Sequence, residues 1–484
     1  MSLRFDWYPN YQHELILSHT DLIVDKLITK GMAKKTKDDL KLITQQIISA
    51  LYSAYTSLPK GNSKVSIPLS SGHYSGTPHS FRVVKQVFQY LCDLGWIEIK
   101  KGNEYKKKVT RIWAIGELSN AFDNLGLIWM PQEPKPEKEL VILRNYQNPE
   151  SETKKGRGKK IDLSVPETPE VHQYRSNLYH YNNFLLKHCV SLELDDENLN
   201  TLTLEMINKS KEDKEVWETE EERVSCLGLR SLQLRRIFSR GSLEKGGRFY
   251  GGFWISIPSL YRPHIRIDGY QTFEMDYSSM ALRIIYAREG IKISENEDLY
   301  DIGLSNYNDQ RRKIIKTYVN AILNDEWGNY SLSKKKQSSL GVSHKELHEL
   351  LLQRHKPISH LFNSGVGLDA QFIDSQIAEE VMLSLLHEEV LVLPIHDSFI
   401  VRAGYADWLR EDMKRVFKKF TNSNVALTID RSRENEHFGL SDDEFSKATK
   451  SSRVIPFSSE ETWEAFSRTE TMDEYLRSWK SFNH

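Results

Sequence analysis

The sequence predicts an α+β fold, in which a core built on an antiparallel sheet follows a smaller unit of helices and a hairpin. The first observation is the stretch LVLPIHDSFIVRA at residues 391–403, where two apolar runs flank a short polar turn. This pattern is typical of two buried antiparallel strands. The second is TFEMDYSSMALRIIYA at residues 272–287, which predicts a strand followed directly by a helix. The third is a pair of amphipathic segments and a basic hairpin near the N-terminus.

Composition limits the class of protein. The chain has 484 residues, of which 39% are hydrophobic and 27% charged, and its net charge is −1. These values are typical of a soluble globular protein of about three domains, and any basic surface must be local. Cys92, Cys189 and Cys226 lack the spacing of metal ligands, which favours a reducing compartment. Because no signal peptide or membrane-spanning run is evident, we expect a cytoplasmic protein.

An N-terminal segment, residues 1–37, precedes the first predicted unit, residues 38–130. Residues 39–58 and 79–96 carry apolar residues at helical spacing. Residues 97–115 alternate apolar with polar residues around a lysine-rich loop, as in a hairpin. Helix, helix and basic hairpin is the order of a winged helix, which this unit resembles. Its hairpin would contact phosphates, or would simply be solvated, through Lys100, Lys101, Lys106, Lys107, Lys108 and Arg111.

The rest of the chain divides by composition. Residues 131–168 are polar and Pro-rich, and we predict a linker. Residues 169–245 begin with a long helical pattern and are predicted as a helical region. Residues 246–430 hold most of the remaining strand and helix signals, and are predicted as the main domain. The tail, residues 431–484, is rich in Ser, Glu and Arg, so we expect it to be peripheral or disordered.

Three segments of the main domain carry residues suited to one chemistry. Asp276 ends a predicted strand, and Asp397 lies at the tip of the predicted turn in the 391–403 stretch. Phosphoryl transfer uses metal ions held by carboxylates and cations that bind the phosphates. Arg312, Lys316, Asn320 and Asn324 recur every four residues on one face of a predicted helix, residues 308–324, and the first two are such cations. The pattern therefore predicts a magnesium-dependent phosphoryl-transfer site, because a buried carboxylate is tolerated when a metal neutralises it.

In order and spacing, residues 230–425 resemble the family A DNA polymerases and the single-subunit phage-type RNA polymerases. The segment Asp276-Tyr277-Ser278 with Leu282-Arg283 resembles the first palm motif of that family. The segment His396-Asp397-Ser398 resembles its hairpin motif. Arg312 and Lys316 resemble the cations of its fingers helix. Its lead-in segment is matched by Gly247-Arg248, Ile257-Pro258, Arg262 and Ile265, and two further helices by Asp374-Ser375-Gln376 and residues 406–420.

The resemblance implies a right-hand polymerase palm with an antiparallel sheet and small helical fingers, a helical thumb-like region over residues 169–245, and a winged-helix domain in front. It implies two Mg²⁺ ions, or Mn²⁺ in their place, bound by Asp276, Asp397 and the backbone carbonyl of Tyr277. It implies that Lys316 is catalytic and protonates the leaving pyrophosphate. The implied nucleotide-binding residues are Arg312, Lys316, Asn320, Ala281 and Tyr277. The implied primer and template contacts are His396, Arg248, Arg262, Gln376 and Arg283.

Three departures from the family narrow the expected function. Ala281 stands where the DNA polymerases carry a glutamate that helps to exclude ribose, and Asn324 stands where they carry an aromatic residue. Ser398 follows the hairpin aspartate, where the RNA polymerases also carry serine and the DNA polymerases mostly carry glutamate. With no exonuclease-like segment, we expect a template-directed nucleotidyltransferase of a phage or mobile element, without proofreading, with relaxed sugar selection or primase- or RNA polymerase-type activity. Its expected partners are a DNA template, a primer and nucleoside triphosphates, with no membrane.

Other readings of these residues stay open. The fold would also suit a catalytically silent DNA-binding replication initiator or regulator. A metal-dependent nuclease would use Asp276 and Asp397 with Asp374 or Glu274. In structural roles alone, Asp276 would cap the following helix, Arg312 and Lys316 would form a solvated face, and His396 would be a hydrogen-bonded turn residue.

Overall fold

The computed structural model describes most of the predicted main domain and parts of the N-terminal half. The described residues are 3–4, 13–29, 37–57, 63–67, 80–101, 110–125, 139–151, 158–194, 197–198, 201–202, 204–206, 232–326 and 330–429. The predicted tail and the tip of the predicted basic hairpin, residues 102–109, lie outside them. Within the described part, no helix is both long enough and apolar enough to cross a bilayer.

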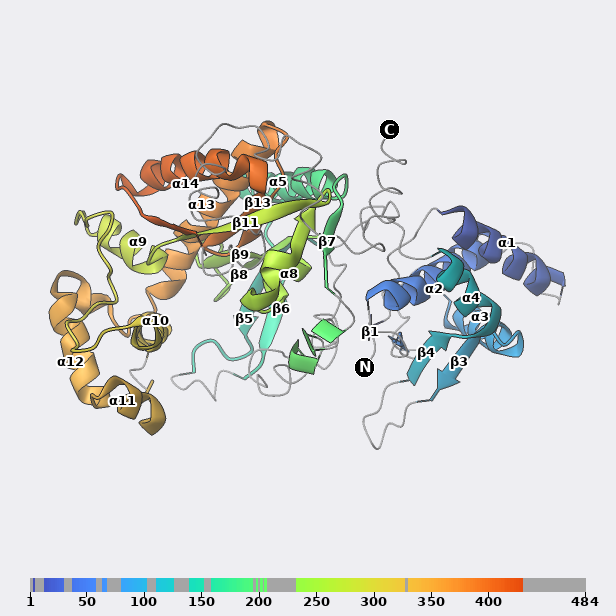
Figure 1. Ribbon diagram of the computed structural model, residues 1–484, viewed down its shortest axis with the longest axis horizontal. Coiled ribbons are helices and arrows are strands. Elements are labelled where there is room, and N and C mark those ends of the chain that lie inside the picture. Colours follow the sequence, from blue (N-terminus) through green and yellow to red (C-terminus); the bar gives the residue numbers. More distant parts are fainter. Residues whose placement is uncertain are drawn as a thin grey trace.

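The N-terminal elements pack into a body of helices over a small sheet (Figure 1). Its helices are α1 (Glu14–Thr29), α2 (Lys37–Ser57), α3 (Phe81–Asp93) and α4 (Gly116–Leu125), and its strands are β1 (Leu3–Arg4), β2 (Val65–Ile67), β3 (Ile97–Lys100) and β4 (Thr110–Ala114). The strand order is β1-β2-β4-β3, antiparallel except for β1 with β2. Both predicted helices and the predicted hairpin are present. Helix α1 packs on α2, so the predicted N-terminal segment belongs to the same body, and its boundary after residue 37 falls at the first residue of α2.

An antiparallel sheet forms the centre of the second half. Its strands are β7 (Val190–Leu192), β10 (Ile265–Ile267), β11 (Tyr270–Tyr277), β12 (Val392–Ile395), β13 (Ser398–Arg402) and β14 (Leu427–Ile429). The order is β12-β13-β11-β10-β7, and β14 also pairs with β11. All of these pairs are antiparallel. The predicted α+β class with an antiparallel sheet is therefore confirmed, and the two predicted strand segments are direct neighbours through β11 and β13.

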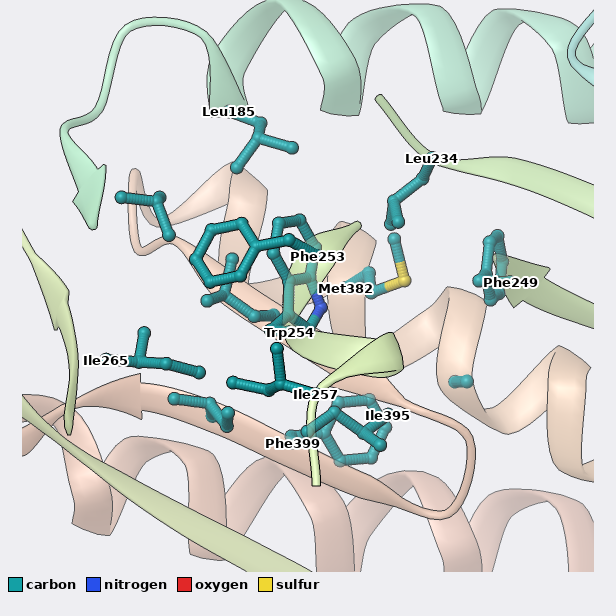
Figure 2. Packing of buried hydrophobic residues seen from close by; sticks show 14 of the residues in the cluster. Leu185, Leu234, Phe249, Phe253, Trp254, Ile257, Ile265, Met382, Ile395 and Phe399 are labelled. Atoms are coloured by element: carbon teal, nitrogen blue, oxygen red, sulfur yellow. The ribbon is translucent and has the colours of Figure 1, made fainter. Parts of the chain in front are cut away.

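Helices surround this sheet (Figure 1). They are α5 (Pro169–Leu185), α8 (Phe253–Ser256), α9 (Met280–Arg288), α13 (Gly367–His387) and α14 (Ala406–Thr421), with the 3₁₀ helices η4 (Ser259–His264), η5 (Lys356–Leu361) and η6 (Ala403–Tyr405). Figure 2 shows the apolar packing between them, where Phe253 and Trp254 of α8 lie near Ile395 and Phe399 of the hairpin. Trp254 also donates from its indole nitrogen to the carbonyl oxygen of Pro394, at 3.0 Å. This contact satisfies a polar group that burial would otherwise make costly.

A separate group of helices lies beside this core (Figure 1). It consists of α10 (Asp309–Asn324), α11 (Lys334–Leu340) and α12 (His344–Arg354). Asn308, Ser333 and Ser343 cap them by accepting hydrogen bonds from backbone N–H groups in the first turn. Such caps start a helix at a defined residue. Helix α10 corresponds to the predicted helix over residues 308–324.

The predicted linker at residues 131–168 is wrong in part, because it contains two strands. These are β5 (Val141–Tyr146) and β6 (Lys160–Leu163), which join β8 (Arg235–Phe238) and β9 (Gly246–Tyr250) in a sheet of order β6-β5-β8-β9. Strand β5 runs parallel to β8, which lies far along the chain. The polar composition around β5 hid it, since its stabilising partner is not local. The predicted helical region 169–245 is also wrong in part, since strands β7 and β8 follow α5.

A buried ion pair ties the β8–β9 strands to α13. The side chain of Arg236 is fully buried. It donates to Glu379 Oε2 at 2.6 Å, to Ser375 Oγ at 3.0 Å and to the carbonyl oxygen of Gly247 at 2.8 Å. Its guanidinium also lies over the ring of Tyr174, 4.2 Å from the centroid. The guanidinium of Arg236, which is shielded from water, is therefore the shared partner of all these groups.

Replacing Arg236 with leucine is expected to lower the free energy of unfolding by about 3–5 kcal/mol, because Glu379 is left as an unpaired buried charge. Urea unfolding followed by circular dichroism would measure the change. Lys419→Met is the control, since Lys419 pairs with Glu380 on the surface, where such a pair contributes about 0–1 kcal/mol. Equal losses from the two substitutions would contradict a special role for the buried pair.

Candidate active site

Two carboxylates meet where strand β11 ends beside the β12–β13 turn. Asp276 pairs in register with Ser398, the residue directly after Asp397. The backbone N–H of Tyr277 donates to the carbonyl oxygen of Asp397 at 3.1 Å, which joins the strand end to the turn. Because side chains alternate along β11, Asp276 is directed to the opposite face from the buried Tyr277. The sheet therefore brings together two residues that are far apart in the sequence.

The environment of Asp276 disfavours the ionised form of its carboxyl group. Its pKa is raised well above the usual value, first because of burial and then because of the nearby charge of Asp397. The charge of Lys316 acts in the opposite direction. One carboxylate oxygen, Oδ1, is buried without a hydrogen-bond partner among the described residues. The reading of Asp276 as a helix cap is wrong, because Ser279 is the N-cap of α9.

Glu274 connects three elements beneath this pair. Its Oε1 accepts hydrogen bonds from Ser398 Oγ at 2.8 Å and from Arg262 Nη1 at 2.9 Å. Arg262, predicted as a primer or template contact, is thus held by a carboxylate at the site, although its Nε is buried without a partner among the described residues. Glu274 therefore braces the strand end through Oε1, since it joins β11 to β13 and to η4.

Asp374 of α13 is a fourth acidic group at the site, after Asp276, Asp397 and Glu274. Its Oδ2 accepts from Arg248 of β9, at 2.7 Å from Nε and 2.6 Å from Nη2. Burial raises its pKa to about 6, with the charge of Arg248 opposing and that of Asp397 adding to the shift. Sequence reasoning named Asp374 in the helix that resembles the polymerase family and in the nuclease alternative, but not among the predicted site residues of the polymerase. The available signal was an aspartate among the apolar positions of a helix, where an unpaired charge would be costly.

His396 occupies the turn next to Asp397. Its backbone is left-handed, with φ of 57°, and its ring meets that of Tyr250 edge-on, with centroids 5.4 Å apart. Burial, followed by the charge of Arg248, lowers its pKa to about 4. Its Nδ1 is buried and has no hydrogen bond to any described residue. The reading of His396 as a hydrogen-bonded turn residue is therefore not supported for this nitrogen.

The lowered pKa of His396 predicts a pH dependence of stability. Between pH 6.5 and 4 the unfolded chain takes up this proton and the folded chain does not, so stability falls as pH falls through that window. The share of His396 is about 3 kcal/mol. His396→Asn should remove it, since asparagine also tolerates positive φ. Urea unfolding at several pH values would measure this. An unchanged slope in the variant would contradict the prediction, and the share of His355, whose pKa is also lowered to about 4, should remain.

Helix α10 presents its two predicted cations differently. Lys316 is half-buried and makes no hydrogen bond or ion pair with any described residue, although its charge acts on Asp276. Arg312 donates from Nε to Asp298 Oδ2 at 2.9 Å and lies over the ring of Tyr300, 5.0 Å from its centroid. Asn320 is exposed on the same helix. The reading of this face as merely solvated is therefore wrong for Arg312, whose guanidinium has an ion pair and a ring contact.

Several other predicted site residues have structural contacts of their own. Arg283 donates to four backbone carbonyl oxygens, those of Ser278, Ser294, Glu295 and Glu297. These bonds engage all three nitrogens of a buried guanidinium, so the contacts do not support its prediction as a primer or template contact. Gln376 donates to Tyr174 Oη at 3.0 Å, and Tyr277 Oη donates to the carbonyl oxygen of Met413 at 2.7 Å. Ala281 is partly buried against the core in the first turn of α9.

Tyr300 is a site residue that sequence reasoning missed. It is buried, and its pKa is raised first by burial and then by the charge of Asp397. It lies in the loop between α9 and α10, where no periodic pattern marks an inward-facing side chain. Only the folded loop reveals that this phenol lies close to the carboxylates.

The donor set is compatible with magnesium. Among the described residues, no group of three or more His, Cys, Asp or Glu side chains has the arrangement of a metal site. Magnesium, however, binds through one or two carboxylates and keeps water and substrate oxygens as further ligands. Asp276 and Asp397 supply two such carboxylates, and the unpartnered Oδ1 of Asp276 is an oxygen that a cation would satisfy.

Comparisons with known proteins add little. No protein-family model matches the chain, and no curated protein matches it either. Among solved structures, it is similar to the POL domain of Pol1 from M. smegmatis, which was solved in complex with a DNA primer-template and dNTP. The identity is 13% and the TM-score 0.29, and the match covers 49% of this chain and 50% of that one. The chain thus spans half the length of that structure, and a likeness of this size carries no argument about shared activity.

Proposed function

We propose that the chain is a template-directed nucleotidyltransferase that adds nucleotides from nucleoside triphosphates to a nucleic-acid strand. One observation carries the proposal. Asp276 at the end of β11 lies beside Asp397 in the β12–β13 turn, and a half-buried Lys316 without an ion-pair partner among the described residues acts on Asp276. Two like charges in a buried place are costly without a cation. Catalysis of phosphoryl transfer uses this combination of carboxylates and a nearby cation.

In this proposal, Asp276 and Asp397 would hold Mg²⁺, with the backbone carbonyl of Tyr277 as a further ligand. The ions, when bound, would neutralise charge on the phosphates and favour the deprotonated primer hydroxyl. Lys316 would stabilise the charge that develops on the phosphates and hold a proton at Nζ for the leaving pyrophosphate. Arg312 would bind the triphosphate from the same face of α10. His396 and Arg248 would contact the primer end beside Asp397.

The remaining elements fit the same proposal. The central sheet would be a polymerase palm, and α10 with α11 and α12 would be small fingers. The N-terminal body would be a winged helix that binds DNA through its basic hairpin. At Ala281 a small side chain stands in the first turn of α9, so we propose that sugar selection is relaxed, and that ribonucleotides are accepted as well as deoxyribonucleotides.

The test is a nucleotide-addition assay with the full chain, a labelled primer-template and Mg²⁺, run with dNTPs, with NTPs and without primer. Extension of the labelled strand is expected with both kinds of nucleotide. Shortening of the strand without added nucleotides would favour a nuclease instead. Tight DNA binding with no product under any condition would overturn the proposal in favour of a catalytically silent replication protein.

A further inference from the structure

The guanidinium of Arg312 makes its hydrogen bond through one nitrogen. Its Nε donates to Asp298 Oδ2 at 2.9 Å, and its two terminal nitrogens make no hydrogen bond with any described residue. A hydrogen bond at Nε fixes the conformation of the side chain. The N–H groups of the two terminal nitrogens then remain available to a second anion. Phosphate oxygens are suitable partners for such a fork, because arginine binds them in a bidentate manner.

Asp298 is itself fixed by donors on both of its oxygens. Oδ2 also accepts from Tyr307 Oη at 2.8 Å, and Oδ1 accepts from the backbone N–H of Tyr300 at 3.1 Å. The ring of Tyr300 lies against the guanidinium of Arg312. All contacts made by this carboxylate are therefore with donors, and the cation is placed between an anion and an aromatic face.

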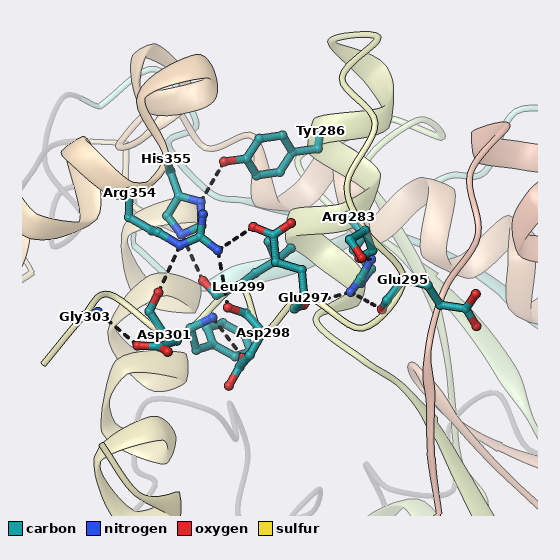
Figure 3. Close-up of polar contacts among 12 residues, drawn as sticks. Arg283, Tyr286, Glu295, Glu297, Asp298, Leu299, Asp301, Gly303, Arg354 and His355 are labelled. Atoms are coloured by element: carbon teal, nitrogen blue, oxygen red, sulfur yellow. Dashed lines mark hydrogen bonds and ion pairs between the residues drawn. The ribbon is translucent and has the colours of Figure 1, made fainter. Parts of the chain in front are cut away.

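The loop that carries Asp298, residues 289–308, is braced from two helices (Figure 3). Arg354 of α12 donates to Glu297 Oε1 at 2.6 Å and to the carbonyl oxygen of Asp301 at 3.0 Å. His355 bonds the carbonyl oxygen of Leu299 through Nε2 at 3.0 Å, and Tyr286 Oη through Nδ1 at 2.9 Å. Since the pKa of His355 is lowered by burial to about 4, the ring is neutral and donates from Nε2. Arg283 of α9 holds the start of the same loop.

The braced loop also reaches the carboxylate pair. Tyr300, next but one to Asp298, is buried, and the charges of Asp397 and Asp276 both act on its phenol. One rigid segment thus contacts Arg312 at Asp298 and approaches the carboxylates at Tyr300. The conformation of this loop therefore determines where Arg312 lies relative to Asp276 and Asp397.

We propose that Asp298 is a positioning residue for triphosphate binding, which holds Arg312 by Nε so that its terminal nitrogens are free for phosphate oxygens. The inference rests on the proposed function, and it assigns a role to a residue of the loop that touches neither metal nor reacting atoms. Preorganised donors of this kind bind an anion without the entropy cost of ordering a flexible side chain.

Asp298→Asn tests the assignment in the full chain. The amide keeps the shape, but its NH₂ must face one of the donors from Arg312, Tyr307 or Tyr300. We expect about tenfold weaker binding of inorganic tripolyphosphate by calorimetry without divalent metal, which corresponds to one charge-assisted hydrogen bond. In the nucleotide-addition assay, KM for the triphosphate should rise by about tenfold while kcat changes by less than about threefold. Tyr307→Phe should shift both in the same direction by a smaller factor.

Asp301→Asn is the matched control, because Asp301 lies in the same loop and its carboxylate bonds the backbone N–H of Gly303. It should leave both measurements unchanged. Combined with Arg312→Gln, Asp298→Asn should cause no further loss, and a further tenfold loss would mean that Asp298 acts through the loop instead, overturning the inference. Wild-type binding and KM in Asp298→Asn would overturn it while the proposed function stands. A wild-type chain that neither adds nucleotides nor binds tripolyphosphate would overturn both.

Discussion

Asp397→Asn is expected to lower the rate of nucleotide addition by at least about 10³-fold, because it removes one of the two carboxylates that would hold the catalytic ions. The loss corresponds to several kcal/mol of transition-state stabilisation. Primer extension under single-turnover conditions measures it. The same substitution also removes the charge that raises the pKa of Asp276, so the protein should be as stable as the wild type or more stable at neutral pH.

The two readouts together separate chemistry from folding. Loss of activity with an unchanged or higher melting temperature is the expected combination. Asp407→Asn serves as the control, since Asp407 pairs with Arg410 within α14 and plays no part in the proposed site. A variant at Asp397 that keeps more than about a tenth of the wild-type rate would show that the carboxylate pair is not the metal site.

Lys316→Ala is expected to lower kcat for nucleotide addition by about 10²-fold, as for other single groups that stabilise developing charge. The physical reason is that Lys316 is half-buried beside Asp276 and keeps its donors free of ion pairs with described residues. Its cation is therefore available to a phosphate, and a low local dielectric makes that interaction stronger than at the surface. Rapid-quench measurement of a single addition gives the rate directly.

Lys313→Ala is the matched control, because Lys313 is exposed on the same helix. It should leave kcat unchanged. If the two substitutions lowered the rate equally, a general attraction between α10 and the nucleic acid would explain the effect, and no specific role for Lys316 would remain. Restoration of much of the activity by Lys316→Arg would indicate that charge is needed more than proton transfer.

Local patterns were sufficient for the elements that carry the site. Alternation in the 391–403 stretch predicted the β12–β13 hairpin, and helical spacing predicted α10. Both patterns are local, because the apolar residues of one strand or helix recur at a fixed spacing and face the same core. Asp276 and Asp397 stood out because each is a charge at the edge of a buried strand. The structure places the two residues at one junction between β11 and the turn.

The errors have a common cause. Strand β5 was missed because its partner β8 is distant in the sequence, and the composition around it resembles a linker. Arg283 is predicted as a primer or template contact from its resemblance to the first palm motif, yet its guanidinium donates to carbonyl oxygens of the loop that follows α9. In both cases the deciding contact joins segments whose proximity no local pattern reveals.

The sequence by itself determined the α+β class, the antiparallel hairpin and the acidic and basic residues offered for chemistry, because these depend on periodicity and residue type. The tertiary structure decided which charges are neutralised. It pairs Arg248 with Asp374, Arg262 with Glu274 and Arg312 with Asp298, and leaves Lys316 and the carboxylates of Asp276 and Asp397 together. Charge pairing depends on distance in space and on burial, so only the folded chain shows which charges are paired and which have no partner among the described residues.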